Sequence, residues 1–222
     1  MIIKVCGLTD TDNIGRVVAL RVDWIGMVFC PSSPRFIQMA STRAGIIPDR
    51  ALHNAPVMNN VKRAGVFVDD MPQNIITRTV NYQLDIIQLH GHETPTLIRN
   101  LRSTIDTDIH PGIQFVKAFS ISSADDFSKC QDYEGVADYF LFDTRSPQRG
   151  GSGKKFDWNV LGAYRGKTPF LLSGGIGPED ADRIKALHYP QMAGIDLNSR
   201  FETSPGIKDI EKLKTFIKAV RA

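Results

Sequence analysis

Two residues suited to acid–base chemistry each end a short apolar run, far apart in the chain. Cys6 closes the run Ile2–Cys6, and Asp143 closes the run Asp138–Asp143. If both runs are parallel strands of one barrel, their carboxyl ends open on the same face. A thiolate can remove a proton and a carboxylic acid can donate one. The pair therefore suits proton transfer at a carbon beside a carbonyl or an imine.

The residues next to this pair bear on its chemistry. Alternation along a strand places Lys4 on the side of Cys6, about 6–7 Å away, where an ammonium group favours the thiolate. The alternative is that Cys6 is a small buried filler. The apolar run before Asp143 favours a carboxyl group that can hold a proton near neutrality. The alternative is that Asp143 caps a loop or helix.

Glycine-rich segments after two of the apolar runs, with Asn198 and Ser199 after a third, indicate an anion site. Glycine allows backbone N–H groups to approach a phosphate closely, and a helix start adds a favourable dipole. Because turns also require glycine, a single cluster would be weak evidence for an anion site. These segments, however, follow neighbouring strands of the predicted barrel, which makes the evidence more specific. The predicted phosphate-binding residues are Gly151, Ser152, Gly153, Gly174, Gly175, Asn198 and Ser199.

Further polar residues are candidates for the same pocket. Arg35 lies in a proline-stiffened loop and suits a planar carboxylate, although a solvated arginine is the commoner case. Gln88 and His90 share one face at the end of another run. The spacing of His90 and His92 resembles a metal motif, but no cysteine or carboxylate stands at ligand spacing. We therefore predict pocket lining and no metal.

Eight strand-like runs alternate with helical segments along the chain. This pattern predicts a single-domain (β/α)₈ TIM barrel over residues 1–222; a doubly wound open sheet is the alternative. The predicted strands are Ile2–Cys6, Trp24–Phe29, Arg63–Val68, Asp85–Leu89, Ile113–Phe119, Asp138–Asp143, Pro169–Leu172 and Met192–Asp196. The predicted helices are Asp10–Arg21, a proline-broken 40–60 segment, Gln73–Tyr82, Glu93–Arg102, Ser123–Cys130, Trp158–Tyr164, Pro178–Ala186 and Ile207–Val220.

Composition narrows the class of protein. The chain has 222 residues and a net charge of +3, too small to indicate a nucleic-acid partner. No run approaches the roughly 18 apolar residues of a membrane span, and no signal peptide is visible. Three widely separated cysteines form no disulfide framework, which favours a reducing compartment. We predict a cytoplasmic protein with no membrane partner.

The motifs also occur in a recognisable order. Lys-Val-Cys-Gly-Leu-Thr stands at 4–9, Gly-Met-Val-Phe at 26–29 with Ser-Pro-Arg at 33–35, and Gly-Val-Phe-Val at 65–68. Gln-Leu-His-Gly follows at 88–91, Phe-Asp-Thr at 142–144 and Gly-Gly-Ser-Gly at 150–153. Leu-Ser-Gly-Gly-Ile stands at 172–176 and Gly-Ile-Asp-Leu-Asn-Ser at 194–199. Over nearly the whole chain, this set resembles the phosphoribosylanthranilate isomerase family of tryptophan biosynthesis.

The resemblance implies an Amadori rearrangement of N-(5′-phosphoribosyl)anthranilate to 1-(2-carboxyphenylamino)-1-deoxyribulose 5-phosphate. Asp143 would be the general acid and Cys6 the general base, while Arg35 would hold the anthranilate carboxylate. Asp196 would hold a ribose hydroxyl, and the backbone at Gly153, Gly175 and Ser199 the phosphate. The implied isomerase needs no cofactor, acts on a small molecule and is a monomer or a homodimer.

Some features depart from the family pattern, and other functions compete. Arg200 stands where members usually carry glycine, Ser152 replaces threonine, and 41–60 matches only loosely. A related indole-pathway synthase would require a lysine in the pocket as its general acid. The histidine-pathway isomerase would require an aspartate in place of Cys6. A non-catalytic phosphosugar-binding barrel would need neither Cys6 nor Asp143.

Overall fold

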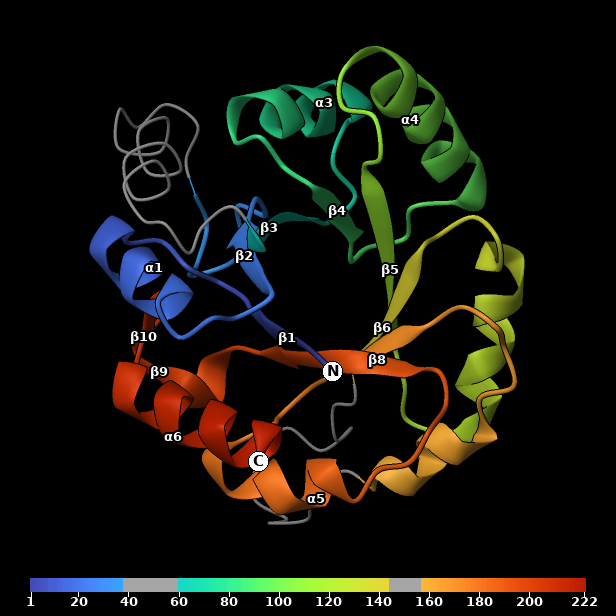
Figure 1. Cartoon of the computed structure of the whole chain (residues 1–222). Helices are drawn as coiled ribbons and strands as arrows, with labels where there is room; N and C mark the ends of the chain where they lie inside the picture. The colour runs from blue at the N-terminus through green and yellow to red at the C-terminus, as the bar shows by residue number, and fades with distance from the viewer. Residues whose placement is uncertain (38–59, 144–156) are drawn as a thin grey trace.

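A closed ring of eight parallel strands forms the centre of the computed structural model, which describes residues 1–37, 60–143 and 157–222 (Figure 1). Each strand pairs with the next in sequence, and the last pairs with the first. The predicted TIM barrel is therefore confirmed. Its strands are β1 (Ile2–Val5), β2 (Trp24–Val28), β3 (Lys62–Phe67), β4 (Ile86–Leu89), β5 (Gln114–Ser120), β6 (Tyr139–Asp143), β7 (Phe170–Ser173) and β8 (Met192–Leu197).

Side chains alternate between the inside of the ring and the helical layer around it. One buried cluster, including Trp24, Ile86 and Leu141, fills the ring near the amino ends of the strands. The outward residues of β6, Phe140 and Phe142, belong to a larger cluster beneath the surrounding helices. The ring is thus a packed core near the amino ends of its strands.

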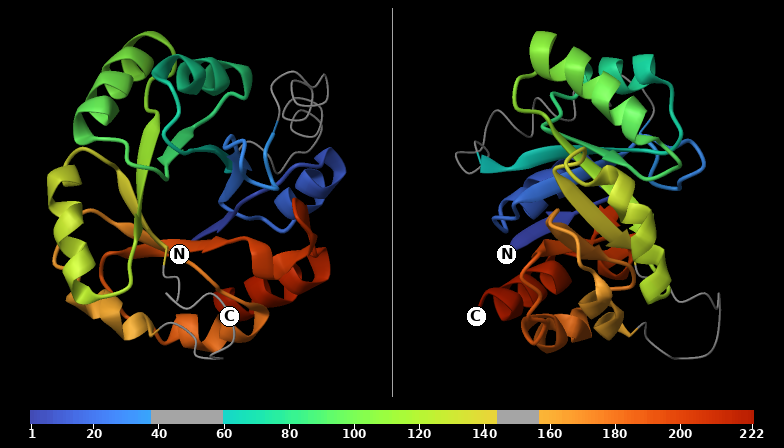
Figure 2. Two further views of the ribbon diagram at one scale, coloured as in Figure 1. Left: turned by 180° about the vertical axis from the view of Figure 1, so that it is seen from behind. Right: turned by 90° about the vertical axis from the view of Figure 1, so that its right-hand side faces the viewer.

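The helical layer consists of five α-helices and several 3₁₀ segments within the described residues (Figure 2). Asp10, Thr94 and Asp209 cap three of the helices, because each side chain accepts a hydrogen bond from a backbone N–H of the first turn. The α-helices are α1 (Thr11–Val18), α3 (Pro72–Asn81), α4 (Pro95–Asp108), α5 (Ala181–Lys185) and α6 (Ile210–Arg221).

Several predicted helices differ in type or extent. The two predicted between β5 and β7 are the 3₁₀ segments η2 (Ala124–Tyr133) and η3 (Trp158–Ala163). The prediction Pro178–Ala186 corresponds to η4 (Pro178–Asp180) followed by α5. The predicted segments 40–60 and 144–155 lie outside the described residues, apart from position 60.

The start of the last predicted helix was wrong for a specific reason. Ile207–Lys208 form strand β10, which pairs antiparallel with β9 (Glu202–Ser204). Gly206, at a φ of +91°, makes the turn between them. We call residues 202–208 the β9–β10 hairpin. It follows η5 (Ser199–Phe201) and precedes α6, so its side chains are held against the carboxyl end of the barrel.

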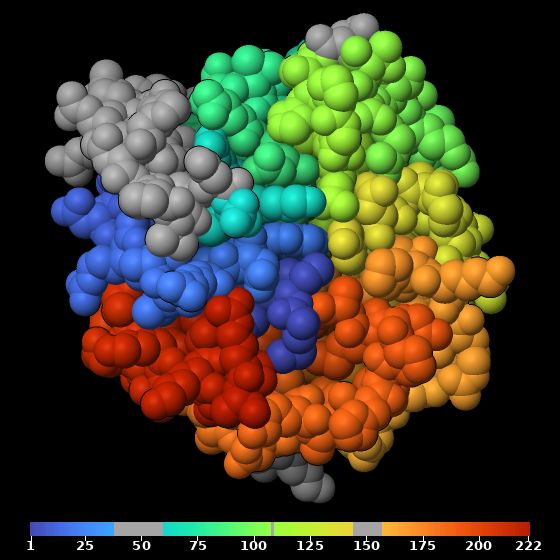
Figure 3. Space-filling view, in the orientation of Figure 1, coloured from blue at the N-terminus to red at the C-terminus, as the bar shows by residue number. Residues whose placement is uncertain are grey.

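The first and last strands close the barrel. Ile3 lies opposite Ile195 and Lys4 opposite Asp196 in the β1–β8 ladder. In the space-filling view, the first residues of the chain, in dark blue, lie next to orange and red segments from its last quarter (Figure 3). Among the described helices, none is long and apolar enough to cross a membrane.

Candidate active site

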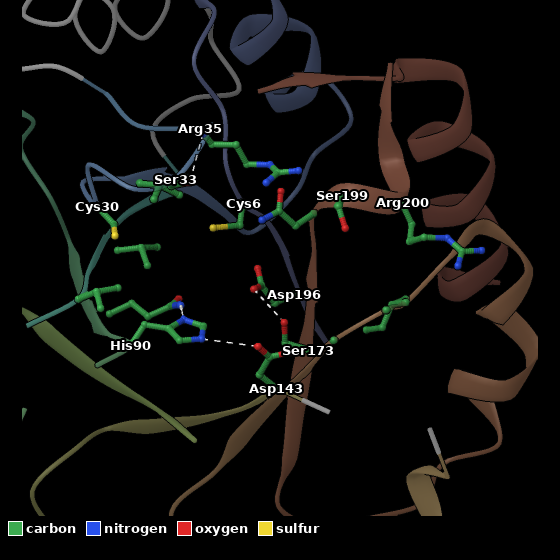
Figure 4. A pocket seen from close by; sticks show the side chains of 18 residues that line it. Cys6, Cys30, Ser33, Arg35, His90, Asp143, Ser173, Asp196, Ser199 and Arg200 are labelled. Carbon is green, nitrogen blue, oxygen red and sulfur yellow. Dashed lines mark hydrogen bonds and ion pairs between the residues drawn. The ribbon is translucent and has the colours of Figure 1, made fainter. Parts of the chain in front are cut away.

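A cavity of about 560 Å³ lies at the carboxyl ends of the strands and receives most of the predicted residues (Figure 4). The predicted Gly151, Ser152 and Gly153 lie outside the described residues. The lining is completed by residues that were not predicted, including Ser33 and Ser173. The predicted residues in the lining are Cys6, Arg35, Gln88, His90, Asp143, Gly174, Gly175, Asp196, Asn198 and Ser199.

Cys6 is the first residue beyond β1, and its backbone N–H continues the ladder to the Leu197 carbonyl at 2.9 Å. A side chain at Gly26 would place its Cβ 2.6 Å from the Cys6 Sγ, so the glycine on the neighbouring strand makes space for the sulfur. The chain then turns at Gly7, whose φ of +78° favours glycine. The side chain of Cys6 is directed into the cavity (Figure 4).

Buried charges surround Cys6. Lys4 Nζ lies 2.9 Å from Asp196 Oδ1, and both residues are buried. Burial raises the pKa of the Cys6 thiol; Lys4 opposes this effect and Asp196 adds to it. Lys4 therefore acts in the predicted direction, but desolvation outweighs it. The thiol is the main form near neutral pH, and the thiolate is formed from it by loss of a proton.

Asp143 is the last residue of β6 and is buried, with its carboxylate at the cavity (Figure 4). Its carbonyl accepts a hydrogen bond from Ile121 N–H at 3.1 Å, which fixes the strand end. His90 Nε2 lies 3.7 Å from Asp143 Oδ2. Asp143 therefore enters the same cavity as Cys6 from a different part of the ring, with an imidazole beside it.

Gln88 orients His90. Its side-chain amide nitrogen lies 3.1 Å from His90 Nδ1. An amide nitrogen only donates, so Nδ1 accepts and, in a neutral ring, Nε2 carries the hydrogen that faces Asp143. The Gln88 Oε1 atom is buried and has no hydrogen-bond partner within the described residues.

The two histidines of the possible metal motif diverge. His90 faces the cavity, whereas the His92 side chain is 96% exposed and its Nδ1 lies 3.0 Å from Asp69 Oδ2. Over the described ranges, no three or more His, Cys, Asp or Glu side chains gather as metal ligands would. The spacing of His90 and His92 thus reflects a strand end followed by a loop.

The described part of the predicted phosphate site lies after β7 and β8. Gly174 and Gly175 have φ angles of +93° and +68°, and both line the cavity with Asn198 and Ser199. Gly177 N–H is already bonded to Asp180 Oδ2 at 2.8 Å. Gly174 and Gly175 therefore bring backbone without side chains to the cavity wall, where backbone N–H groups can meet an anion.

Sequence reasoning missed two buried charges that reach the predicted arginine. The guanidinium of Arg35 donates to the carboxylate of Glu202 through Nε, at 2.8 Å, and through Nη2. Lys208 Nζ donates to the same carboxylate at 2.7 Å. Glu202 and Lys208 both belong to the β9–β10 hairpin, so recognising the turn at Gly206 was the signal that could have located them.

Sequence comparisons agree with this geometry. The profile of the N-(5′-phosphoribosyl)anthranilate (PRA) isomerase family matches residues 3–219. The N-(5′-phosphoribosyl)anthranilate isomerase of Parabacteroides distasonis is 45% identical over 220 residues, which cover 99% of this chain and 93% of that protein. The corresponding enzyme of Phocaeicola vulgatus is 42% identical, with 100% and 98% covered.

Solved structures agree as well. The phosphoribosyl anthranilate isomerase of Thermotoga maritima superposes with a TM-score of 0.78 at 31% identity, covering 100% of this chain and 99% of that one. A phosphoribosyl anthranilate isomerase in complex with reduced 1-(o-carboxyphenylamino)-1-deoxyribulose 5-phosphate gives 0.77 at 28% identity, with the same coverage. With the family profile matched along almost its full length, the chain belongs to the phosphoribosylanthranilate isomerase family.

Proposed function

We propose that Cys6 is the general base and Asp143 the general acid of this isomerase. The protein is an enzyme that converts N-(5′-phosphoribosyl)anthranilate to 1-(2-carboxyphenylamino)-1-deoxyribulose 5-phosphate in tryptophan biosynthesis. One observation carries the assignment of roles. A thiol and a carboxyl group from β1 and β6, strands that are not neighbours in the ring, line one cavity.

Ring opening is the first step. Asp143 donates its proton to the ribose ring oxygen as the C1′–O bond breaks, and the lone pair of the anthranilate nitrogen forms the C1′=N bond. The product is an open-chain cationic imine and an Asp143 carboxylate. The Nε2–H of His90, 3.7 Å from this carboxylate, can stabilise the negative charge that develops there.

Proton removal is the second step. The Cys6 thiolate takes the proton from C2′, and the C2′–H electron pair forms the C1′=C2′ bond while the imine electrons return to nitrogen. The resulting enolamine tautomerises to the ketone. In this mechanism the imine is the electron sink, so no cofactor takes part in the proton transfers.

Other residues of the cavity are suited to hold the substrate. Arg35 presents a planar guanidinium to the anthranilate carboxylate, and Asp196 and Gln88 offer buried oxygens to ribose hydroxyls. The phosphate is assigned to the backbone of Gly174 and Gly175, with Asn198 and Ser199. Gly151, Ser152 and Gly153 remain part of the proposed phosphate site.

The fluorescence of freshly prepared phosphoribosylanthranilate tests this function directly. Its decay should accelerate in proportion to the concentration of added enzyme, with formation of the deoxyribulose product. Cys6→Ser and Asp143→Asn proteins, checked for folding by circular dichroism, are the controls. Acceleration by the wild type that persists in both variants would refute the assigned roles.

We also propose that residues 1–222 act as one barrel domain in the cytoplasm, with a small-molecule substrate and no nucleic-acid or membrane partner. The oligomeric state is proposed to be a monomer or a homodimer. One solved relative, with a TM-score of 0.75 at 28% identity, consists of monomers generated from the dimeric phosphoribosylanthranilate isomerase of Thermotoga maritima. Light scattering coupled to size-exclusion chromatography distinguishes the two states, and a larger assembly would contradict both.

A further inference from the structure

Arg35 is fixed on both its aliphatic stem and its charged head. A Cβ on Gly7 would lie 2.5 Å from Arg35 Cδ, so the stem lies directly over the bare backbone that follows Cys6. The head donates to Glu202 through Nε and Nη2, which form one edge of the guanidinium. A guanidinium has five N–H donors in a rigid fork, so the edge formed by Nη1 and Nη2 keeps its own pair of donors. Within the described residues, Nη1 has no protein partner.

Glu202 is itself held by the rest of the β9–β10 hairpin. Its Oε1 atom accepts hydrogen bonds from Lys208 Nζ at 2.7 Å and from Gly206 N–H at 3.2 Å. Lys208 is fully buried and also donates to Asn198 Oδ1 at 2.8 Å. Asn13 of α1 bonds the Lys208 backbone on both sides, at 2.8 and 2.9 Å. The carboxylate therefore has little freedom to follow Arg35 if the arginine moves.

The contacts of this cluster favour the charged forms of Glu202 and Arg35, whereas burial lowers the pKa of Lys208 despite its hydrogen bond to Glu202. Burial alone would raise the pKa of Glu202, but hydrogen bonds from Arg35 and Lys208 outweigh it, so the pKa lies below its usual range. The hydrogen bond to Glu202 raises the pKa of Arg35. Two cations share one carboxylate, which leaves one net positive charge beside Cys6 and Asn198. A carboxylate entering the cavity meets an arginine whose charge Glu202 and Lys208 together do not cancel.

We propose that Glu202 is a positioning residue for substrate recognition. It binds the Nε–Nη2 edge of the Arg35 guanidinium, so that the Nη1–Nη2 edge is presented to the carboxylate of the anthranilate ring. Lys208 keeps Glu202 in place and supplies the charge that the first carboxylate would otherwise neutralise. This inference rests on the proposed role of Arg35. It makes the β9–β10 hairpin, which bears no catalytic group, a determinant of selectivity for ligands with an ortho carboxylate.

A pair of ligands separates positioning from general stability. The first is reduced 1-(o-carboxyphenylamino)-1-deoxyribulose 5-phosphate, which a solved relative binds; the second is the same compound without its ring carboxylate. Calorimetric dissociation constants for both give a carboxylate preference. Glu202→Gln should reduce this preference by about tenfold or more, because a misplaced guanidinium no longer meets the carboxylate. Affinity for the second ligand should change much less.

Two controls sharpen the experiment. Glu179→Gln removes the partner of Arg200, another arginine in the cavity lining, and should leave the preference unchanged. In an Arg35→Ala background, the preference is already lost, so adding Glu202→Gln should change it no further. If Glu202→Gln fails to fold, Glu202→Asp is the substitute. Its shorter side chain keeps a carboxylate near Lys208 but no longer reaches Arg35, so the carboxylate preference should fall by the same amount.

The outcomes are distinct. A wild type with no carboxylate preference would overturn the role of Arg35 and, with it, this inference. A wild-type preference that survives in the folded Glu202 variants would overturn the positioning role alone. If the Glu202 variants lose affinity for both ligands equally, Glu202 has a purely structural role, and the proposed positioning role is overturned.

Discussion

The two sides of the cavity are built from different chemistry. Around Cys6, the carboxyl ends of β1, β2 and β8 carry buried ion pairs: Lys4 with Asp196, and Arg35 and Lys208 with Glu202. Around Asp143, the described neighbours are the imidazole of His90 and the neutral amide of Gln88, with aromatic residues of β6 behind the strand.

This difference matches the two proton transfers. The base must lose a proton in a site that also receives an anionic substrate, and fixed cations on that side offset the accumulating negative charge. The proposed acid must hold a proton before the ring opens, and the imidazole of His90 lies beside the carboxylate that forms afterwards. Within the described residues, the buried ion pairs of the cavity thus lie on the side of Cys6, which we call its charged half.

Removing the base should have the largest effect. Cys6→Ser is expected to lower kcat by roughly 10⁴-fold, the upper end of the range for a general base, because a hydroxyl is a far weaker base than a thiolate. Affinity for the reduced product analogue should persist, since the surrounding ion pairs remain. Steady-state kinetics and calorimetry measure the two quantities. Turnover close to wild type would remove Cys6 from the chemistry.

Removing the acid should come next. Asp143→Asn is expected to lower kcat by about 10³-fold, because an amide cannot donate the proton that opens the ribose ring. The substitution leaves the charged half of the cavity untouched, so analogue binding reports whether the fold survives. A variant that retains its turnover would identify another group as the acid.

Loss of the arginine should affect binding more than turnover. Arg35→Ala is expected to weaken binding of carboxylate-bearing ligands by roughly 2–5 kcal/mol, because it also leaves Glu202 with only part of its partners. KM should rise much more than kcat falls. An unchanged affinity for the reduced product analogue would place the substrate carboxylate elsewhere.

The pH dependence should report the buried thiol. Because the pKa of Cys6 is raised above its usual value of 9.0, the proton is bound in neutral solution and is released as the pH increases towards the folded-state pKa. Thiolate content should therefore increase up to about tenfold per pH unit over that range. Alkylation of Cys6, followed by mass spectrometry, should increase in parallel. An alkylation rate that does not depend on pH would contradict the raised pKa of the thiol.

The exposed arginine should matter least. Arg200 pairs with Glu179 at 2.7 Å, and both side chains are about half exposed. Exposed ion pairs contribute about 0–1 kcal/mol, so Arg200→Gly should change KM by less than about fivefold. Comparison with Arg35→Ala measures the difference between a partly buried arginine and an exposed one. A larger change would show that Arg200 meets the phosphate directly.

The sequence predicted the residues at the strand ends because their positions follow from local patterns. Apolar runs locate strands, and the barrel brings the following residues together, so Cys6 and Asp143 could be placed in one cavity. Extents of helices were predicted less well. The 3₁₀ geometry of η2 and η3 depends on how each segment packs across its strand pair, and residue preferences alone do not encode that.

Buried charges were the main omission. Glu202 and Lys208 stand in a polar stretch that looks solvent-exposed, and only the turn at Gly206 folds it onto Arg35. Lys117 on β5 is similar: it points away from the ring interior and pairs with buried Glu93 at 3.1 Å, while donating to the carbonyl of Gly91 beside His90. Such pairs join positions far apart in the chain, so spacing within one segment could not reveal them.

Closure of the ring between β1 and β8 has a consequence for synthesis of the protein. The backbone of Cys6 bonds to Leu197, and Lys4 pairs with Asp196, almost two hundred positions later. A nascent chain on the ribosome therefore carries Cys6 without these neighbours until nearly all of the polypeptide has emerged. Contacts between residues so far apart in the sequence form late in folding. The pairing of β8 with β1, which closes the ring, therefore also completes the surroundings of Cys6.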